Sequence, residues 1–443
     1  MQGPLASTST IAAIATGPAA GGIGIVRVSG PRAVVAARRV ARGLPALLTP
    51  RHAYFTRFAD ASGQVLDEGL ALYFPAPHSF TGEDVVELHA HGAPRLLSLL
   101  LAEVLREEGV RLATAGEFTR RALLSGRVDL SRAEAVADLV AAESEAQVRA
   151  AAAQLAGELT DRLAAVHGPL LALQADLEGS LDFPEEADGA DAEADVRLDV
   201  LLGAVRALVA DGRRGALIRR GARVVLYGPV NAGKSTLFNA LVGASRALVD
   251  AEPGTTRDTL EARLELGGLA VTLIDTAGLR EGAGRLEALG IGRTRDAIAG
   301  ADLAVLVLPP AAAAHEVAAW RVECEDARRL DVHGKADLRG QADQLPRVSG
   351  QTGEGLEQLR ELVIVRLSTD AAAAVSSSGQ RHLAALEQVE AALQRARAAL
   401  TVSTLEVVAG EVGLAVNALA EVTGEDASSE LLDAIFARFC IGK

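Results

Sequence analysis

The stretch GPVNAGKS, Gly228–Ser235, has the residue types and spacing of a phosphate-binding loop. It follows the apolar run VVLY and precedes STLFNALVG, which predicts a strand before the loop and a helix after it. In this setting the backbone N–H groups at the helix N-terminus point at phosphate oxygens. Lys234 would reach the β- and γ-phosphates, and Ser235 would bind Mg²⁺. The other nucleotide contacts predicted in this segment are Asn231, Ala232, Gly233 and Thr236.

Two further segments would complete the site for the phosphates and Mg²⁺. VTLID, Val271–Asp275, is an apolar run that ends in an aspartate, which can reach Mg²⁺ through water. The next residues predicted to contact the nucleotide are Thr276, Ala277 and Gly278. Between the two motifs, EPGTTRD offers Thr256, with Thr255 beside it, for closing on Mg²⁺ when a γ-phosphate is present. From the residues alone, EPGTTRD could also be an ordinary turn.

The stretch DVHGKADL, Asp331–Leu338, bears on which base the nucleotide carries. A guanine-binding loop usually reads Asn-Lys-x-Asp, and here Gly334 stands at the Asn position. Asp337 can accept the ring N–H and amino donors of guanine, a pairing that adenine cannot make. Lys335 can pack its stem along the base. We therefore predict a guanine site whose affinity or selectivity Gly334 weakens, and a loop that no longer reads the base is the alternative.

The stretch SGQTGEG, Ser349–Gly355, is a weaker signal for the same site. It resembles the Ser-Ala loop that backs the guanine ring in G domains, with Gly350 at the position of the Ala. Taken alone it is little more than a turn. Its place after the other motifs favours a base-binding loop, with Ser349 as a nucleotide contact.

Strand and helix patterns alternate around these motifs from about residue 216 to 371. Such alternation predicts a parallel sheet covered by helices. Residues 1–122 read as mixed α/β, with GGIGIVRVSG, ALYFPAP and DVVELHAHG as strand-like runs. Ala-rich helical patterns fill 123–215 and 372–443. We predict a multidomain α/β and α fold: an N-terminal α+β domain, a helical domain made from both flanking segments, and an inserted Ras-like P-loop domain.

Two details of the helical segments are also predicted. Ser131 and Glu134 have the spacing of a capping box, in which each side chain satisfies a backbone N–H of the other residue. The acidic stretch FPEEADGADAEAD, Phe183–Asp195, reads as a loop.

Composition limits the partners and the compartment. The chain has 443 residues and a formal net charge of −14, so a broad basic surface for nucleic acid is not expected, and an RNA substrate would need a local patch or a partner. Cys324 and Cys440 are the two cysteines, which disfavours a disulfide framework and favours a reducing cytosol. No signal peptide and no apolar stretch of about 18 residues is present, so we expect a cytoplasmic protein without a membrane span.

The order of these motifs resembles the MnmE (TrmE) family of bacterial tRNA modification GTPases, within the TrmE-Era-EngA-like G proteins. The segments that carry the resemblance are STIAAIATGPAAGGIGIVRVSG, SFTGEDVVELHAHGAP, GEFTRRALLSGRVDLSRAEAVADL, NAGKS, GTTRD, DTAGLRE and LAEVTGEDASSELLDAIFARFCIGK. It runs from about residue 9 to 443 and is weakest over 308–347. The terminal FCIGK and the GGIGIVR run are its most specific parts.

The resemblance implies a function as well as a fold. The N-terminal domain would bind 5,10-methylene- or 5-formyl-tetrahydrofolate and form a homodimer. The flavoprotein MnmG, which alone carries FAD, would join it in a heterotetramer and hold much of the tRNA. Together they would add an aminomethyl or carboxymethylaminomethyl group to C5 of the wobble uridine in certain tRNAs. GTP hydrolysis would move the two G domains toward and away from each other.

The resemblance also assigns roles to residues of the G domain. Asn231 would bind a K⁺ ion that supplies positive charge where other GTPases use an arginine finger. Asp250, Glu252 and Thr255 would complete the K⁺ site. Glu287 would be the catalytic residue that orients the attacking water. From the residues alone, Asn231 could equally well cap the loop, and Glu287 is one helix-surface Glu among many.

Folate contacts are implied in the same way for Arg27, Glu87, Arg127 and Lys443. A carboxylate suits the donor edge of a pterin, and Glu87 shares a strand face with His89. An Arg–Glu pair that bridges two strands is the alternative. His89 and His91 could share a face, but a metal pair has no third ligand. Cys440 is expected near the folate and needed for the modification, whereas Cys324 is incidental.

Two other functions stay open at the level of sequence. One is a regulatory GTPase or assembly factor whose output is a GTP-dependent interaction, with the N-terminal domain only a dimerisation module. The other is a scaffold whose G domain no longer responds to nucleotide. The FCIGK tail and the set Arg27, Glu87 and Arg127 argue against the first. The intact Lys234, Ser235, Asp275 and Glu287 argue against the second.

Overall fold

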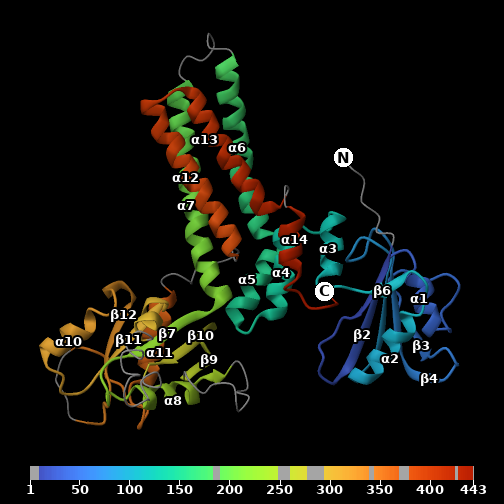
Figure 1. Ribbon diagram of the computed structural model, residues 1–443, viewed down its shortest axis with the longest axis horizontal. Helices are drawn as coiled ribbons and strands as arrows, with labels where there is room; N and C mark the ends of the chain where they lie inside the picture. The colour runs from blue at the N-terminus through green and yellow to red at the C-terminus, as the bar shows by residue number, and fades with distance from the viewer. Residues whose placement is uncertain are drawn as a thin grey trace. The chain divides into compact units, whose positions relative to one another are not determined.

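The computed structural model is multidomain, with mixed α/β sheets and many helices, which confirms the predicted fold class (Figure 1). It describes residues 9–182, 190–247, 260–276, 294–338, 344–368, 379–424 and 428–442. Two compact units are present, one formed by Met1–Val140 with Ala420–Lys443 and one by Ala141–Leu419. Within these described ranges, none of the helices has the length and apolar character needed to cross a membrane.

The first unit is built on a six-stranded sheet in the order β3-β4-β5-β2-β1-β6. Its strands are β1 (Thr10–Ile14), β2 (Gly21–Ser29), β3 (Tyr54–Ala59), β4 (Val65–Phe74), β5 (Val85–Gly92) and β6 (Val110–Leu112). β1 pairs with β6 in parallel, and the other pairings are antiparallel. The strand predictions for GGIGIVRVSG and DVVELHAHG are confirmed as β2 and β5. The prediction for ALYFPAP is confirmed for ALYF alone, because β4 begins earlier, at Val65, and ends at Phe74.

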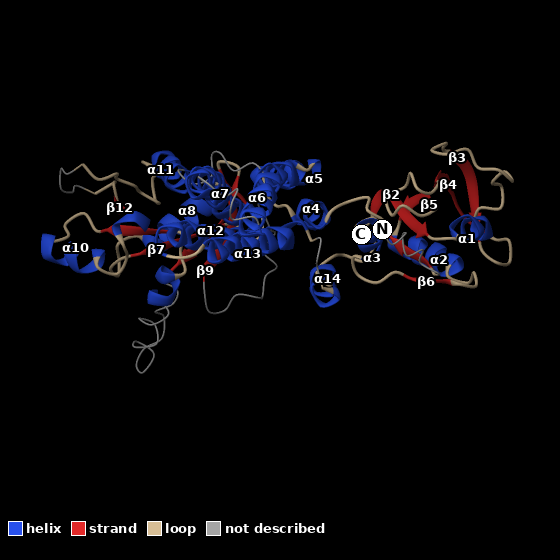
Figure 2. Cartoon of the chain, turned by 90° about the horizontal axis from the view of Figure 1, so that it is seen from above, coloured by secondary structure: helices blue, strands red, loops and turns tan. Residues whose placement is uncertain are grey.

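Helices α1 (Ala33–Val40) and α2 (Pro94–Val104) pack against one face of this sheet (Figure 2). Val26 and Val28 of β2 point into the core beneath these helices. Because side chains alternate along a strand, Arg27 faces the opposite side. That side carries the start of α3 (Glu117–Leu124), where Phe118 packs with Ile11.

Two helices complete the first unit, α4 (Leu130–Ala141) and α14 (Ser429–Phe436). The side chain of Asp129 accepts a hydrogen bond from the Arg132 N–H at 2.7 Å and so caps α4. The predicted capping box at Ser131 and Glu134 is therefore wrong, because Ser131 already lies inside the helix. Three residues, Ala133, Phe436 and Phe439, form the buried cluster between α4 and the C-terminal segment.

Long helices make up much of the second unit. They are α5 (Glu145–Ala156), α6 (Glu158–Asp182), α7 (Ala190–Arg220), α12 (Gln380–Val402) and α13 (Leu405–Thr423). α12 lies along α7, where Arg206 and Glu390 pair at 3.1 Å (Figure 1). The prediction of a loop at Phe183–Asp195 is wrong for its last residues, because α7 begins at Ala190.

A second sheet, in the order β12-β11-β7-β10-β9-β8, also belongs to this unit. Its strands are β7 (Ala222–Tyr227), β8 (Arg246–Ala247), β9 (Leu260–Leu266), β10 (Leu269–Asp275), β11 (Leu303–Leu308) and β12 (Arg329–His333). The four strands from β12 to β10 are parallel, as the alternating pattern predicted. β9 and β8 extend the sheet in antiparallel fashion.

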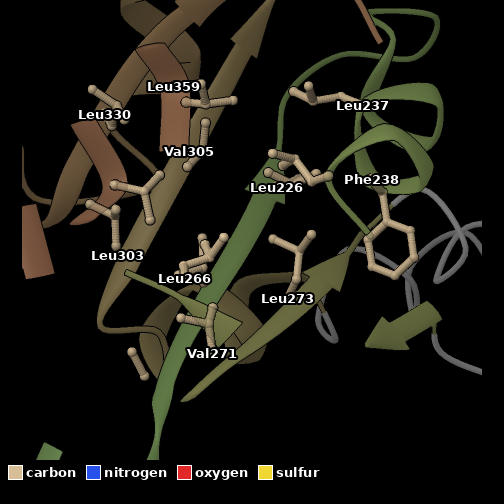
Figure 3. Packing of buried hydrophobic residues seen from close by; sticks show 14 of the residues in the cluster. Leu226, Leu237, Phe238, Leu266, Val271, Leu273, Leu303, Val305, Leu330 and Leu359 are labelled. Carbon is tan, nitrogen blue, oxygen red and sulfur yellow. The ribbon is translucent and has the colours of Figure 1, made fainter. Parts of the chain in front are cut away.

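Helices cover both faces of this sheet. On one face, α8 (Lys234–Ala244) and α11 (Leu356–Ser368) bury Leu237, Phe238 and Leu359 against Leu226 and Leu273 (Figure 3). On the other face, the helix at residues 294–299 and α10 (Ala314–Arg321) cover the remaining strand side chains. This parallel sheet brings the carboxyl ends of β7, β10, β11 and β12 to one edge, where ligands bind in α/β folds.

Candidate functional site

The loop between β7 and α8 has the geometry that phosphate binding requires. Asn231 (φ 62°) and Gly233 (φ 100°) both lie in the left-handed region, which Asn and Gly tolerate best. Helix α8 starts at Lys234, so its free N–H groups follow the loop directly. The buried Lys234 ammonium donates to the carbonyl oxygens of Gly228 and Pro229 at 3.1 and 2.8 Å. The lysine ammonium is thus held against the predicted phosphate-binding loop.

Asp275 and Thr276 lie at the end of β10, beside this loop. β10 pairs in parallel with β7, and Asp275 lies opposite Leu226. The Thr276 hydroxyl and N–H both donate to the Leu226 carbonyl, at 2.9 and 3.3 Å. Asp275 is fully buried. The structure therefore brings the two predicted phosphate motifs to the same sheet edge, with Ser235 in the first turn of α8.

The predicted base motif also folds as a strand and a loop. β12 is an edge strand, so its polar side chains are tolerated: Asp331 pairs with Arg329 at 2.8 Å and with Arg321 at 2.7 Å. Leu330 and Val332 on the other face are buried. This alternation explains why RRLDVH looks poorly apolar and still forms a strand.

A cavity of about 230 Å³ lies between α8 and the two predicted base loops. Its lining includes Gly233, Thr236, Lys335, Asp337, Ser349 and Gly350. The Ser349 hydroxyl donates to Asp337 Oδ1 at 2.5 Å and so fixes the carboxylate. Lys335 has φ 56°, a conformation that costs a side-chain-bearing residue about 1–2 kcal/mol and is typical of functional loops. The cavity has the donors, acceptors and position of a base pocket.

In the first unit, a second polar cluster surrounds Arg27. Its guanidinium donates to Glu87 Oε1 at 2.9 Å across the β2–β5 pair and to the Gly442 carbonyl at 3.4 Å. Its central carbon lies 5.9 Å from the Phe80 ring centre and 5.7 Å from that of Phe118. An arginine between two rings and a carboxylate is oriented before any ligand arrives.

The C-terminal segment reaches this cluster along a defined path. Ile441 forms an isolated antiparallel bridge with Ala115, and the Cys440 carbonyl accepts from the Gly116 N–H at 3.5 Å. Cys440 is exposed. Arg127 is also exposed, and its Cγ lies beside Gly82. Arg27, Glu87 and the tail are thus brought together, whereas within the described residues no hydrogen bond or ion pair joins Arg127 to them.

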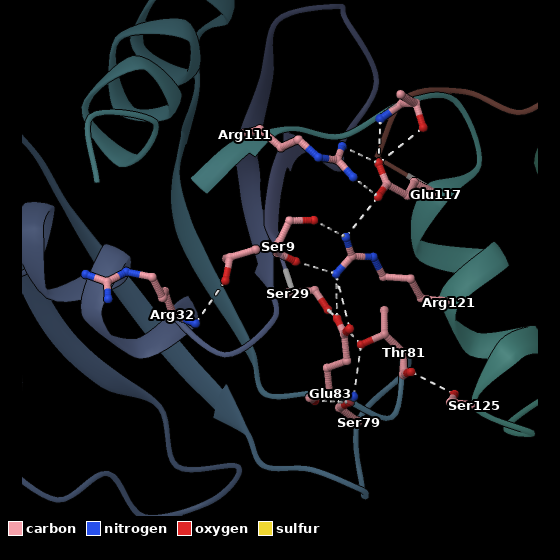
Figure 4. A network of polar contacts seen from close by, with 12 residues as sticks. Ser9, Ser29, Arg32, Ser79, Thr81, Glu83, Arg111, Glu117, Arg121 and Ser125 are labelled. Carbon is pink, nitrogen blue, oxygen red and sulfur yellow. Dashed lines mark hydrogen bonds and ion pairs between the residues drawn. The ribbon is translucent and has the colours of Figure 1, made fainter. Parts of the chain in front are cut away.

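A buried charge network supports the two segments that carry Phe80 and Phe118 (Figure 4). Arg121 of α3 donates to Glu83 at 3.0 Å and to Glu117 at 2.9 Å. Burial alone would raise the pKa of Glu117, but hydrogen bonds from Arg111, the Thr114 N–H and Arg121 outweigh it and hold that pKa at about 2. The network therefore ties the SFTGED loop to α3.

Comparison with known proteins gives the family. Residues 130–440 match the family described as MnmE helical domain, and residues 10–127 match the GTP-binding protein TrmE N-terminus. The tRNA modification GTPase MnmE of Myxococcus xanthus (strain DK1622) is 60% identical over 440 residues, which cover 99% of either chain. This chain belongs to the MnmE family.

Other relatives agree with this assignment. The tRNA modification GTPase MnmE of Xanthomonas campestris pv. campestris (strain B100) is 44% identical over 454 residues, covering 99% of this chain and 100% of that protein. Among solved structures, the G domain of the T. maritima FeoB iron transporter is 28% identical over 33% of this chain and 98% of its own, with a TM-score of 0.26. The two family models and the two MnmE relatives confirm the resemblance expected from the motifs.

Several residues predicted for this MnmE chain lie outside the described ranges. They are Asp250, Glu252, Thr255, Thr256, Ala277, Gly278, Glu287 and Lys443. Among the described residues, no group of three or more His, Cys, Asp or Glu side chains could hold a metal ion. His89 contacts Glu87 at 3.2 Å, and His91 contacts Asp67 at 2.8 Å, so the two histidines have separate carboxylate partners.

Sequence reasoning missed four contacts in the candidate sites. It did not find the rings of Phe80 and Phe118 beside Arg27, the Arg121–Glu83 pair, or the Ser349–Asp337 hydrogen bond. The sequence contained part of the information needed to find these contacts. Phe80 lies in SFTGED and Phe118 in GEFTRR, two of the segments that carried the resemblance.

Proposed function

We propose that this MnmE family member is the GTP-hydrolysing subunit of a tRNA modification system. The observation that carries the proposal is the base pocket, in which Ser349 fixes Asp337 beside a P-loop whose lysine is already held in place. A carboxylate fixed in this way matches the paired N–H donors of guanine. The curated relatives that cover the chain from end to end are tRNA modification GTPases.

The residues present fit GTP with its metal ions. Lys234 and the N–H groups of the loop would hold the phosphates, and Ser235 with Thr256 would bind Mg²⁺, with Asp275 reaching it through water. Asn231 is exposed on the loop and would offer its carboxamide oxygen to K⁺. The remaining K⁺ ligands would come from Asp250, Glu252 and Thr255. The K⁺ ion supplies positive charge near the developing charge on the phosphates.

Glu287 would orient the attacking water, and the Arg27–Glu87 cluster would bind a one-carbon tetrahydrofolate with help from Arg127 and Lys443. The domain division proposed is residues 1–122 for folate binding and dimerisation, 123–215 with 372–443 for the helical domain, and 216–371 for the G domain. The chain would act as a cytoplasmic homodimer with MnmG on C5 of the wobble uridine. MnmG would hold much of the tRNA, in keeping with the net charge of −14.

The first experiment measures steady-state GTP hydrolysis by the full chain in KCl and in NaCl at equal ionic strength. Strong stimulation by K⁺ is expected. Asn231→Gly should abolish the stimulation, because Gly keeps the left-handed backbone and removes only the carboxamide. Asn239→Ala, at an exposed position of α8, is the matched control and should keep it. Equal and negligible rates in both salts would contradict the K⁺ mechanism.

A further inference from the structure

Two departures from the usual guanine-binding motifs are glycines, and both touch the phosphate-binding segment. A Cβ added at Gly334 would lie under 3.0 Å from the carbonyl oxygen of Ala232, and 2.9 Å from Val307 Cγ1. The Ala232 oxygen belongs to the backbone of the P-loop and cannot rotate away as the end of a side chain could. An Asn at position 334 therefore does not fit this loop without moving the P-loop and the base loop apart.

Gly350 makes the same kind of contact from the second base loop. Its added Cβ would lie 2.6 Å from the carbonyl carbon and oxygen of Thr236 and 2.7 Å from the Leu237 nitrogen. These atoms belong to the first turn of α8. The Ala that usually occupies this position does not fit here without displacing the loop from the helix.

Hydrogen bonds join the two loops to each other and to the sheet. The Gly334 N–H donates to the Leu308 carbonyl at 2.8 Å, and the Ala336 N–H donates to the Val348 carbonyl at 3.0 Å. The Ser349–Asp337 bond connects their side chains. The two loops are therefore joined to each other, and Gly334 and Gly350 are the residues at which they contact the P-loop and α8.

We propose that Gly334 and Gly350 form a matched pair of specificity-determining residues, which set the width of the base pocket by direct backbone contact. This inference rests on the proposed GTP binding. The sequence alone suggested that the missing Asn loosens the guanine site. In the folded chain, backbone packing takes over the bracing that the Asn side chain usually provides, so restoring the Asn should damage the pocket.

The test compares GDP and IDP affinities of the full chain and its variants by calorimetry. IDP lacks the 2-amino group of guanine, so the ratio of the two affinities reports whether Asp337 still faces the base edge. Gly334→Asn and Gly350→Ala are each expected to weaken GDP binding at least about tenfold, because overpacking must separate the loops from the phosphates. The preference for GDP over IDP should fall as well, which a general loss of stability would not cause.

Gly243→Ala is the matched control, because a Cβ at this α8 position meets nothing within 4 Å. Its affinities should equal those of the wild type. If Gly334→Asn does not fold, Gly334→Ala, which adds the Cβ alone, takes its place. If the folded variant binds GDP as tightly as the wild type or more tightly, the proposed role of Gly334 and Gly350 is overturned. Absence of GDP binding by the wild type overturns the proposed function itself.

Discussion

Glu87 on β5 lies directly opposite Arg27 on β2, and its Oε1 accepts a hydrogen bond from Arg27 Nε at 2.9 Å. The side chains are 16% and 19% exposed, so the pair is open to a ligand and still shielded enough to interact strongly. Phe80 and Phe118 flank the same guanidinium. Because both side chains are already oriented, either partner of this charge pair can turn to a polar ligand in place of the other.

The first prediction concerns this exchange. Glu87→Gln should weaken the binding of 5-formyl-tetrahydrofolate at least about tenfold, because the pterin donors lose a charged acceptor. GDP binding should not change, because the nucleotide residues belong to the other compact unit. Calorimetric titration of the full chain with each ligand measures both effects.

Glu68→Gln is the matched control for Glu87→Gln. Glu68 pairs across strands with Arg57 at 2.7 Å on the same sheet, but the two side chains are 47% and 71% exposed. Such a pair contributes less than about 1 kcal/mol. Unchanged folate binding in Glu87→Gln would leave Arg27 and Glu87 as a structural pair. Absence of folate binding by the wild type would instead favour a regulatory GTPase whose N-terminal domain only dimerises.

The second prediction is the pH dependence of Glu117. Its pKa is about 2 in the folded chain and 4.5 ordinarily, so its stabilising effect is complete above about pH 4.5 and is lost as the pH falls toward 2. The shift corresponds to at most about 3 kcal/mol, and solvent screening reduces this to about 1–2 kcal/mol. Glu117→Gln should therefore be less stable than the wild type at pH 7, with the difference shrinking toward pH 3.

Scanning calorimetry of the wild type and Glu117→Gln from pH 7 to pH 3 measures this difference. Glu68→Gln serves again as a control and should show a small difference from the wild type at every pH. A difference for Glu117→Gln that stays constant down to pH 3 would contradict the assignment, because it would mean that the ion pairs with Arg111 and Arg121 do not depend on the carboxylate charge.

Local patterns were enough to predict the strands β2, β4, β5 and β7 and the P-loop, because apolar period and glycine spacing act over a few residues. They were not enough for the surroundings of Arg27, since Phe80, Phe118 and Gly442 come from distant parts of the chain. The prediction of the α4 cap was wrong for a different reason. Asp129 and Ser131 are both good capping residues, and in the structure it is Asp129 that accepts the hydrogen bond from the Arg132 N–H.

The third prediction concerns Tyr227 at the end of β7. It is 3% exposed, burial raises the pKa of its hydroxyl, and that hydroxyl has no hydrogen-bond partner among the described residues. A buried hydroxyl without a partner costs about 1–3 kcal/mol. Tyr227→Phe should therefore raise the free energy of unfolding by about 1 kcal/mol in denaturant titrations.

Tyr73→Phe is the opposite case and the control for Tyr227→Phe. The Tyr73 hydroxyl donates to Asp84 at 3.0 Å, so its removal should lower the free energy of unfolding by about 1 kcal/mol. The two substitutions are therefore expected to change the free energy of unfolding in opposite directions. A clear loss of stability in Tyr227→Phe would show that its hydroxyl makes an important contact, for example through an ordered water.

The last prediction separates base binding from phosphate chemistry through Ser349. Ser349→Ala removes the hydroxyl that fixes Asp337, and a hydrogen bond to a charged group contributes about 1.5–3 kcal/mol. KM for GTP should rise about tenfold while kcat stays the same, because the base is bound equally in the ground state and the transition state. Ser245→Ala is the control, since the Ser245 hydroxyl has no hydrogen-bond partner within the described ranges. A fall in kcat at constant KM would mean instead that Ser349 acts on the phosphate end of the site.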